Sequence, residues 1–149
     1  ICVDSCVFQA LEAVLTELEA KGVPWGIVTN KPRYLAEKLL NEMQLDQRCA
    51  VLVCPDDVSR TKPDPEPMYM ALEKLGIPRG AAGCVLYVGD HIRDIEAGNA
   101  AGMPTILAAY GYIPPEDQKS LKKWGADYIT DTPEQLNKLL LSSGKFEYL

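Results

Sequence analysis

Short apolar segments alternate with amphipathic segments along most of the 149-residue sequence. Short apolar runs that end at polar residues are typical of strands buried on both faces, whereas apolar residues spaced three and four apart indicate helices. The expected strands are residues 25–30, 50–53, 84–88, 105–108 and 128–130. The expected helices are residues 8–18, 32–43, 66–75, 92–101 and 133–140. This alternation predicts an α/β fold, a Rossmann-like doubly wound parallel sheet with right-handed crossovers and helices on both faces.

Ligands of such a sheet bind beyond the carboxyl ends of its strands, so the residues that follow the strands are where chemistry is expected. Polar segments stand at three of these positions: Thr29-Asn30, the loop that contains Lys62, and the residues from Gly89 to Asp94. In a parallel sheet these strand ends lie on the same edge. We therefore expect the segments to converge on one rim.

Charge and hydropathy exclude several classes of function. The sequence has 15 lysines and arginines against 21 aspartates and glutamates, so its net charge is −6, and the acidic residues are spread along the chain. This balance argues against nucleic-acid binding driven by bulk charge. No apolar run approaches the roughly 18 to 20 residues that cross a bilayer, and the first residues lack the basic start and cleavage site of a secretory signal. We expect a cytoplasmic protein without membrane or nucleic-acid partners.

The five cysteines form an odd set without a Cys-x-x-Cys pair, and His91 is the only histidine. Neither a disulfide framework nor a zinc site is therefore expected. Cys54 and Cys84 lie in or beside apolar runs. We expect both to be small buried hydrophobic side chains.

Thr29 and Asn30 end an expected strand and precede an expected helix that begins near Pro32. A hydroxyl and backbone N–H groups at that position suit an anion such as phosphate. The structural alternative is that Thr29 caps the following helix or only ends the strand.

Lys62 follows the second expected strand in a proline-rich loop, with Pro63 and Pro65 just after it. Prolines restrict the backbone that holds the lysine. A point charge held in place suits a phosphoryl oxygen or a carboxylate nucleophile. The alternative is an ordinary solvated lysine on a surface loop.

The segment from Gly89 to Asp94 combines a tight turn with two carboxylates. Asp90 ends the strand, and Asp94 lies four residues further on, on the same side of the first helical turn. Such a pair suits Mg²⁺, which takes few protein oxygens and keeps waters and substrate phosphate oxygens. The alternative is that Asp90 is the N-cap and Asp94 a first-turn acid favoured by the helix dipole. His91 is expected in a solvated or supporting role, and Arg93 at the surface or beside an acid.

In this order, these motifs resemble those of the haloacid dehalogenase-like superfamily, in its phosphatase branch. The family's second, third and fourth motifs are similar to Ile27-Val28-Thr29-Asn30, Lys62-Pro63-Asp64-Pro65 and Val88-Gly89-Asp90-His91-Ile92-Arg93-Asp94. The resemblance extends from about Phe8 to Leu140. Within the superfamily, residues 29–32 resemble the phosphoglycolate phosphatase group. Residues 25–32, 111–113, 115–117 and 124–127 are similar to the N-acetylmuramic acid 6-phosphate phosphatases of bacterial cell-wall recycling.

The resemblance implies Mg²⁺-dependent hydrolysis of a phosphomonoester, a small phosphorylated acid or sugar, through an aspartyl-phosphate. In such an enzyme Thr29 and Asn30 would hold the phosphoryl group, and Lys62 would neutralise it and orient the nucleophile. Asp90 would bind Mg²⁺. Asp94 would belong to the metal site or support Lys62.

The family's first motif, an apolar strand that ends in Asp-x-Asp-Gly-Thr, is absent from the sequence. In the family its first aspartate is the nucleophile and its second the general acid and base. Asp4 is the only early candidate, but it lacks the second aspartate and the Gly-Thr turn and stands where a helix cap is expected. We therefore expect this chain alone to be inactive as a hydrolase.

The strand of that first motif lies in the centre of the family's sheet, between the strands that end at Thr29 and Asp90. We therefore expect two half-sheets with unpaired inner edges in this chain. Residues 1–149 would be the C-terminal part of a core domain, and an N-terminal segment of roughly 60 to 80 residues would complete the sheet and add a cap domain. Arg33, Tyr110 and Tyr112 remain as candidates for substrate contacts at the rim.

Two other functions are compatible with the sequence. The absent nucleophile favours a non-catalytic module that binds a phosphorylated ligand or partner through the same rim. A nucleotide-binding or receiver-like domain has only the alternation in its favour, since the sequence contains no Gly-rich dinucleotide or P-loop motif.

Overall fold

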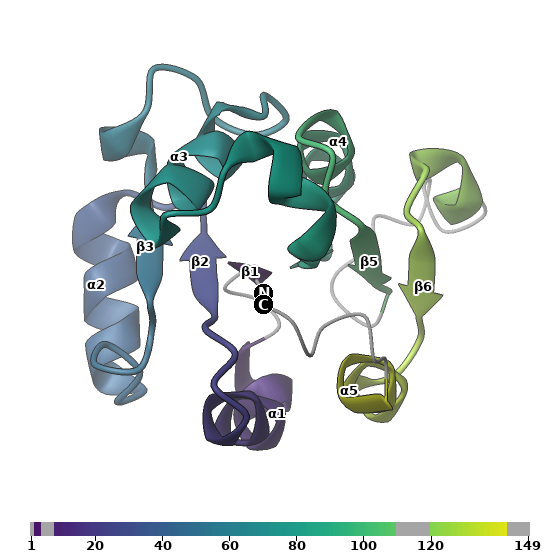
Figure 1. The fold of residues 1–149 in the computed structure, drawn as a ribbon, viewed down its shortest axis with the longest axis horizontal. Helices are drawn as coiled ribbons and strands as arrows, with labels where there is room; N and C mark the ends of the chain where they lie inside the picture. Colours follow the sequence, from purple (N-terminus) through teal and green to yellow (C-terminus); the bar gives the residue numbers. More distant parts are fainter. Residues whose placement is uncertain (1, 4–7, 110–119, 143–149) are drawn as a thin grey trace.

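The computed structural model describes residues 2–3, 8–109 and 120–142. Six parallel strands form one sheet in the order β3-β2-β1-β4-β5-β6 (Figure 1). The strands are β1 (Cys2–Val3), β2 (Gly26–Val28), β3 (Val51–Val53), β4 (Tyr87–Gly89), β5 (Thr105–Ala108) and β6 (Tyr128–Thr130). The helices are α1 (Phe8–Ala20), α2 (Arg33–Glu42), α3 (Glu66–Leu75), α4 (Ile92–Ala100) and α5 (Pro133–Ser142). The expected α/β class, with a parallel sheet and helices on both faces, is confirmed.

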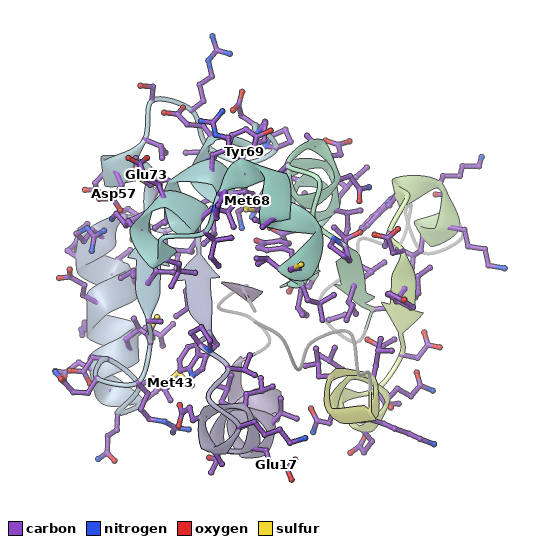
Figure 2. All side chains as sticks on the ribbon, viewed as in Figure 1. Glu17, Met43, Asp57, Met68, Tyr69 and Glu73 are labelled. Carbon is purple, nitrogen blue, oxygen red and sulfur yellow. The ribbon has the colours of Figure 1, made fainter. Side chains whose placement is uncertain are left out.

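The helices cover both faces of the sheet, and Leu40 of α2 packs in the same cluster as α1 and α5. Figure 1 shows α1 and α5 on one side and α3 and α4 on the other. Side chains alternate through the start of β4: Val88 and the preceding Leu86 pack in the cluster that contains α1 and α5, whereas Tyr87 packs in the cluster that contains α3. Met68 of α3 is fully buried in the second cluster (Figure 2). The sheet thus lies between these two apolar clusters.

The expected gap in the centre of the sheet is not observed. Cys2 of β1 pairs with Gly26 and Tyr87, and Val3 pairs with Ile27 and Val88. The prediction of two half-sheets that lack a central strand is therefore wrong for the described residues. The physical reason is that a short apolar segment can extend between β2 and β4 and pair their inner edges, which would otherwise be buried with unmet backbone hydrogen bonds.

Two further expectations need correction in the segment before β4. Residues 84–88 were expected to form one strand, but a 3₁₀ helix spans Arg79–Cys84 and β4 begins only at Tyr87. Small residues between positions 80 and 83 allow that tight turn. Cys84 ends the 3₁₀ helix and is exposed, so the expectation that it is buried is wrong.

Cys54 is buried, as expected, directly after β3. Burial raises the pKa of its thiol to about 11, because a thiolate would lose its hydration there. The thiol is therefore neutral at physiological pH and behaves as a small apolar side chain. Among the described residues, Cys49, Cys54 and Cys84 form no disulfide.

Helix α2 receives its cap from a distant part of the chain. Its N-cap residue, Pro32, makes no side-chain cap. Instead, the backbone N–H of Arg33 donates to Oδ1 of Asp56 at 2.9 Å, in the 3₁₀ helix Pro55–Asp57 that follows β3. The expected alternative, in which Thr29 caps this helix, is therefore wrong. None of the helices among the described residues is long and apolar enough to cross a membrane.

Gly26 lies against Val51 where β2 and β3 pair. A Cβ atom at position 26 would overlap the Val51 side chain and lie 2.8 Å from its carbonyl oxygen. Because the obstructing atoms include backbone, neither strand can relax by a simple side-chain rotation. A glycine is required here by close approach of the neighbouring strand.

We predict that Gly26→Ala destabilises the protein by about 1–3 kcal/mol, because the added methyl group overpacks the sheet. Gly83→Ala is the matched control, since a Cβ there meets no atom within 4 Å. The free energy of unfolding in urea measures both effects. Equal stability of the two variants would contradict the close packing of β2 on β3.

Candidate functional site

The three segments singled out by the sequence meet at the carboxyl edge of the sheet. Lys62 reaches back to the end of β2, where its Nζ donates to the carbonyl oxygen of Val28 at 3.0 Å. Nδ2 of Asn30 lies 3.4 Å from the carbonyl oxygen of Lys62. The same ammonium also contacts Asp94, at the start of α4. The expected convergence of these segments is confirmed.

The Lys62 side chain is completely buried, so the alternative of a solvated surface lysine is wrong. Its Nζ lies 2.6 Å from Oδ1 of Asp94 and 3.0 Å from the hydroxyl oxygen of Tyr87. With the Val28 carbonyl, three acceptors from β2, β4 and α4 surround the ammonium. An ammonium can only donate, and each of these three oxygen atoms can accept from it.

Asp94 is also fully buried and uses its two oxygens differently. Oδ1 accepts from Lys62, whereas Oδ2 accepts from the backbone N–H groups of Asp90 and His91 at 3.2 and 3.1 Å. Gly89 makes room for this carboxylate, because a Cβ at position 89 would lie 2.8 Å from Cγ of Asp94. These contacts favour, for Asp94, the support of Lys62 over direct metal binding.

Asp90 lies directly after β4 and is 8% exposed. It is not the N-cap of α4, so that alternative is wrong. His91 is the N-cap: its Nδ1 accepts from the backbone N–H of Arg93 at 3.2 Å, and Asp94 completes a capping box. The imidazole of His91 therefore has a supporting role, as expected, and helix capping does not account for Asp90.

Thr29 follows β2 and is buried. Its Oγ1 accepts from the backbone N–H of Lys31 at 3.1 Å, which folds the loop at the end of the strand. Oδ1 of Asn30 is buried and has no hydrogen-bond partner among the described residues. A hydroxyl and an unpaired amide oxygen thus stand at the edge where a polar ligand was expected.

Arg33 turns away from this edge, toward strand β3. Its guanidinium pairs with Glu37 at 3.0 Å and with Asp57, and it donates to the carbonyl oxygen of Leu52 at 3.3 Å. The hydrogen bond to Glu37 raises the pKa of Arg33 above its ordinary value, against the effect of partial burial. The other two rim candidates, Tyr110 and Tyr112, lie outside the described residues.

The residues present fit part of a Mg²⁺ site. Mg²⁺ is usually held by one or two protein carboxylates, with waters and substrate oxygens completing the shell. Asp90 offers one carboxylate, directly after β4. The described residues contain no cluster of three or more His, Cys, Asp or Glu side chains that could hold a metal by themselves.

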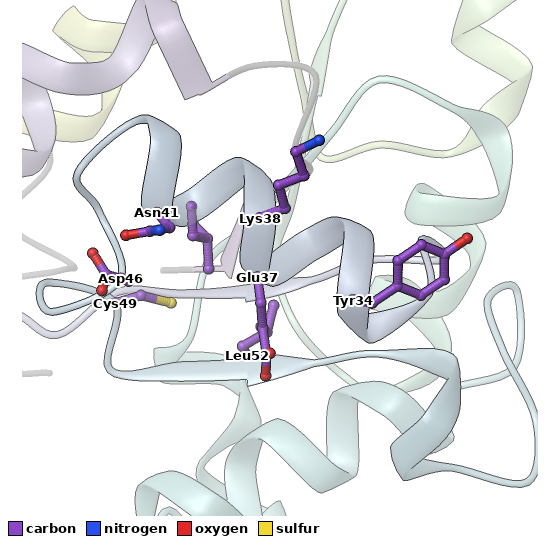
Figure 3. A pocket seen from close by; sticks show the side chains of 8 residues that line it. Tyr34, Glu37, Lys38, Asn41, Asp46, Cys49 and Leu52 are labelled. Atoms are coloured by element: carbon purple, nitrogen blue, oxygen red, sulfur yellow. The ribbon is translucent and has the colours of Figure 1, made fainter.

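A separate hollow of about 780 Å³ lies beside α2 and strand β3 (Figure 3). Its lining mixes charged, polar and apolar side chains, and it includes none of the predicted site residues. The lining residues are Tyr34, Glu37, Lys38, Leu40, Asn41, Asp46, Cys49 and Leu52. The candidate site is therefore identified by its chemistry and not by the presence of a deep cavity.

Residues 5–108 match the family model described as haloacid dehalogenase-like hydrolase. The chain is 42% identical over 141 residues to an N-acetylmuramic acid 6-phosphate phosphatase of Pseudomonas putida, covering 95% of the chain and 61% of the relative. It is 44% identical over 130 residues to a phosphoglycolate phosphatase of Xanthomonas campestris, covering 87% of the chain and 57% of the relative. The chain thus spans about three fifths of the length of these curated relatives.

Solved structures show the same architecture. A HAD phosphatase from Thermococcus onnurineus superposes with a TM-score of 0.72 at 26% identity, covering 90% of this chain and 58% of that chain. The similarity extends over nearly all of the described sheet and helices.

We predict that Lys62→Met destabilises the protein by about 3–5 kcal/mol, because it leaves the buried Asp94 carboxylate without its cation. Arg60→Met is the matched control from the same loop, since Arg60 is 77% exposed and lies 3.6 Å from Asp64. A surface pair of that kind contributes about 0–1 kcal/mol. Urea unfolding of both variants measures the difference, and similar losses would show that the Lys62–Asp94 pair is not the tighter interaction.

Proposed function

The chain belongs to the haloacid dehalogenase-like hydrolase family, and on that premise we propose that it forms the phosphate- and Mg²⁺-binding edge of a phosphomonoester hydrolase. The observation that most strongly supports this proposal is the buried Lys62 ammonium, held 2.6 Å from Asp94 at the edge that also presents Thr29 and Asp90. Burying such a pair is costly unless its geometry is well satisfied. With Mg²⁺ bound at Asp90, a site of this kind would suit the recognition of a small anion.

The residues divide the work on a phosphomonoester between them. The Thr29 hydroxyl donates to a phosphoryl oxygen. The Lys62 ammonium neutralises part of the phosphate charge and keeps that charge in a fixed position. Asp90 would hold Mg²⁺. When bound, Mg²⁺ would offset the negative charge of the phosphate group and orient it.

The proposed substrate is a small phosphorylated acid or sugar. The curated relatives bear the names N-acetylmuramic acid 6-phosphate phosphatase and phosphoglycolate phosphatase, and both of those substrates combine a phosphate ester with a carboxylate. The family resemblance implies transfer of the phosphoryl group to an aspartate before hydrolysis. The sequence contains no Asp-x-Asp-Gly-Thr motif to supply that aspartate, and Asp4 lies outside the described residues.

The absent motif supports a second candidate function. A module with the same edge but without an attacking carboxylate would bind a phosphorylated ligand or partner and leave it intact. The two candidates share the phosphate site and differ in turnover. Phosphate binding tests what they share, and phosphate release separates them.

We predict that the protein binds inorganic phosphate in the presence of Mg²⁺ and that Asp90→Asn weakens this binding at least about tenfold, since the variant loses a charged ligand of the metal. Asp131→Asn is the matched control. Asp131 also follows a strand, β6, at the carboxyl edge, but it is exposed. Isothermal titration with and without Mg²⁺ measures the affinities. Equal phosphate affinity of Asp90→Asn and the parent protein would contradict the proposed metal site.

Turnover is measured on the protein purified from the cells that make it. Phosphate release from 2-phosphoglycolate or N-acetylmuramic acid 6-phosphate that depends on Mg²⁺ and stops on chelation is the expected result. Binding of phosphate without release from either ester would favour the non-catalytic module. The intact mass of the same sample, compared with 16.4 kDa for the present sequence, tests the expectation of an additional N-terminal segment.

A further inference from the structure

Tyr87 is a buried tyrosine whose hydroxyl lies beside the Lys62 ammonium. Its side chain is on β4, on the face covered by α3, and the residue has no exposed surface. The hydroxyl oxygen is 3.0 Å from Nζ of Lys62. It is also 3.5 Å from the Val28 carbonyl oxygen and 3.5 Å from Oδ1 of Asp94. All three polar neighbours belong to the same buried cluster.

The direction of these hydrogen bonds follows from the chemistry of the groups. An ammonium can only donate, so Lys62 donates to the oxygen of Tyr87. The Val28 carbonyl oxygen and Oδ1 of Asp94, each 3.5 Å from the hydroxyl oxygen, are acceptors within reach of the phenolic proton. Tyr87 therefore links the lysine to both of its other acceptors, and removing its hydroxyl would disturb all of these contacts.

Packing alone does not explain a tyrosine at this position. The other residues of its cluster are predominantly apolar, and a phenylalanine would fill the same space without a polar atom to satisfy. The ring also contributes to the environment of the cation, since Nζ of Lys62 lies 5.7 Å from its centroid. Tyr87 thus offers the Lys62 side chain both a hydrogen-bond acceptor and an aromatic ring.

We propose that Tyr87 is a positioning residue for Lys62. A lysine stem has four rotatable carbons and loses much rotamer freedom when its charge is fixed in one place. Asp94 and Val28 hold the ammonium from α4 and β2, and Tyr87 supplies the third direction from β4, the strand that ends at Asp90. The Tyr87 hydroxyl therefore keeps the Lys62 ammonium in one position at this edge of the sheet. This inference rests on the proposed phosphate-binding role of the edge, and Tyr87 itself contacts no substrate in it.

The test compares Tyr87→Phe with Tyr69→Phe. Tyr69 of α3 also donates its hydroxyl to a backbone carbonyl, that of Ala100 at 3.4 Å, but that hydrogen bond is exposed (Figure 2). Hydrogen exchange of the Lys62 ammonium protons, followed by ¹⁵N NMR, reports directly on how firmly the charge is held. We expect exchange to accelerate roughly tenfold in Tyr87→Phe, and phosphate affinity with Mg²⁺ to fall by a similar factor, with neither change in Tyr69→Phe.

The possible outcomes separate this inference from the proposed function. Unchanged Lys62 exchange in Tyr87→Phe overturns the positioning role, even if the variant is less stable. Faster Lys62 exchange in Tyr87→Phe, together with a parent protein that binds no phosphate, supports the positioning of Lys62 by Tyr87 and overturns the phosphate site. If Tyr87→Phe does not fold, the unmodified protein decides: a nuclear Overhauser effect between the Lys62 ammonium and the Tyr87 ring supports the contact, and its absence overturns it.

Discussion

The buried ion pair between Lys62 and Asp94 is the interaction on which the candidate site depends. Both side chains are fully buried, and the pair joins the loop after β3 to the first turn of α4 across the end of β2. Removing two charges from water is costly, and attraction between them compensates only where the remaining donors and acceptors are also satisfied. The Val28 carbonyl, the Tyr87 hydroxyl and two backbone N–H groups meet that condition. The chain therefore has to fold around this pair as well as around its apolar core.

Asp94 shows that helix capping and site chemistry are not competing explanations for a residue. Its Oδ2 accepts from the backbone at the start of α4 and thereby completes a capping box with His91. Its Oδ1 takes no part in the capping box and accepts from the Lys62 ammonium. Anchoring one oxygen to the backbone fixes the direction of the other, so the local structure of the helix start determines where the lysine is held. Close packing against Gly89 removes the remaining freedom of the carboxylate.

The sequence predicts the sheet, the helices and the meeting of the polar segments, because these depend on periodicity and on the common direction of parallel strands. It does not predict contacts that cross the chain. Asp56 caps α2 from another loop. In the sequence, Tyr87 is only one more residue of an apolar run, and its contact with Lys62 is not evident. The two residues of β1 are too few to show any periodicity, so their place in the centre of the sheet follows only from the unpaired edges on either side. Burial of Lys62 was likewise not visible, since a lysine in a proline-rich loop is usually solvated.

Charge balance explains why the proposed function requires a cation. Asp94 neutralises Lys62, and Asp90 adds a negative charge at the same edge. These three residues together therefore repel a phosphate dianion rather than attract it. Binding of Mg²⁺ at Asp90 would reverse the sign of the local charge. The Lys62 ammonium could then attract a phosphoryl oxygen. In the proposed function the ion pair thus sets the position of the positive charge, whereas the metal supplies the excess charge that makes phosphate binding favourable.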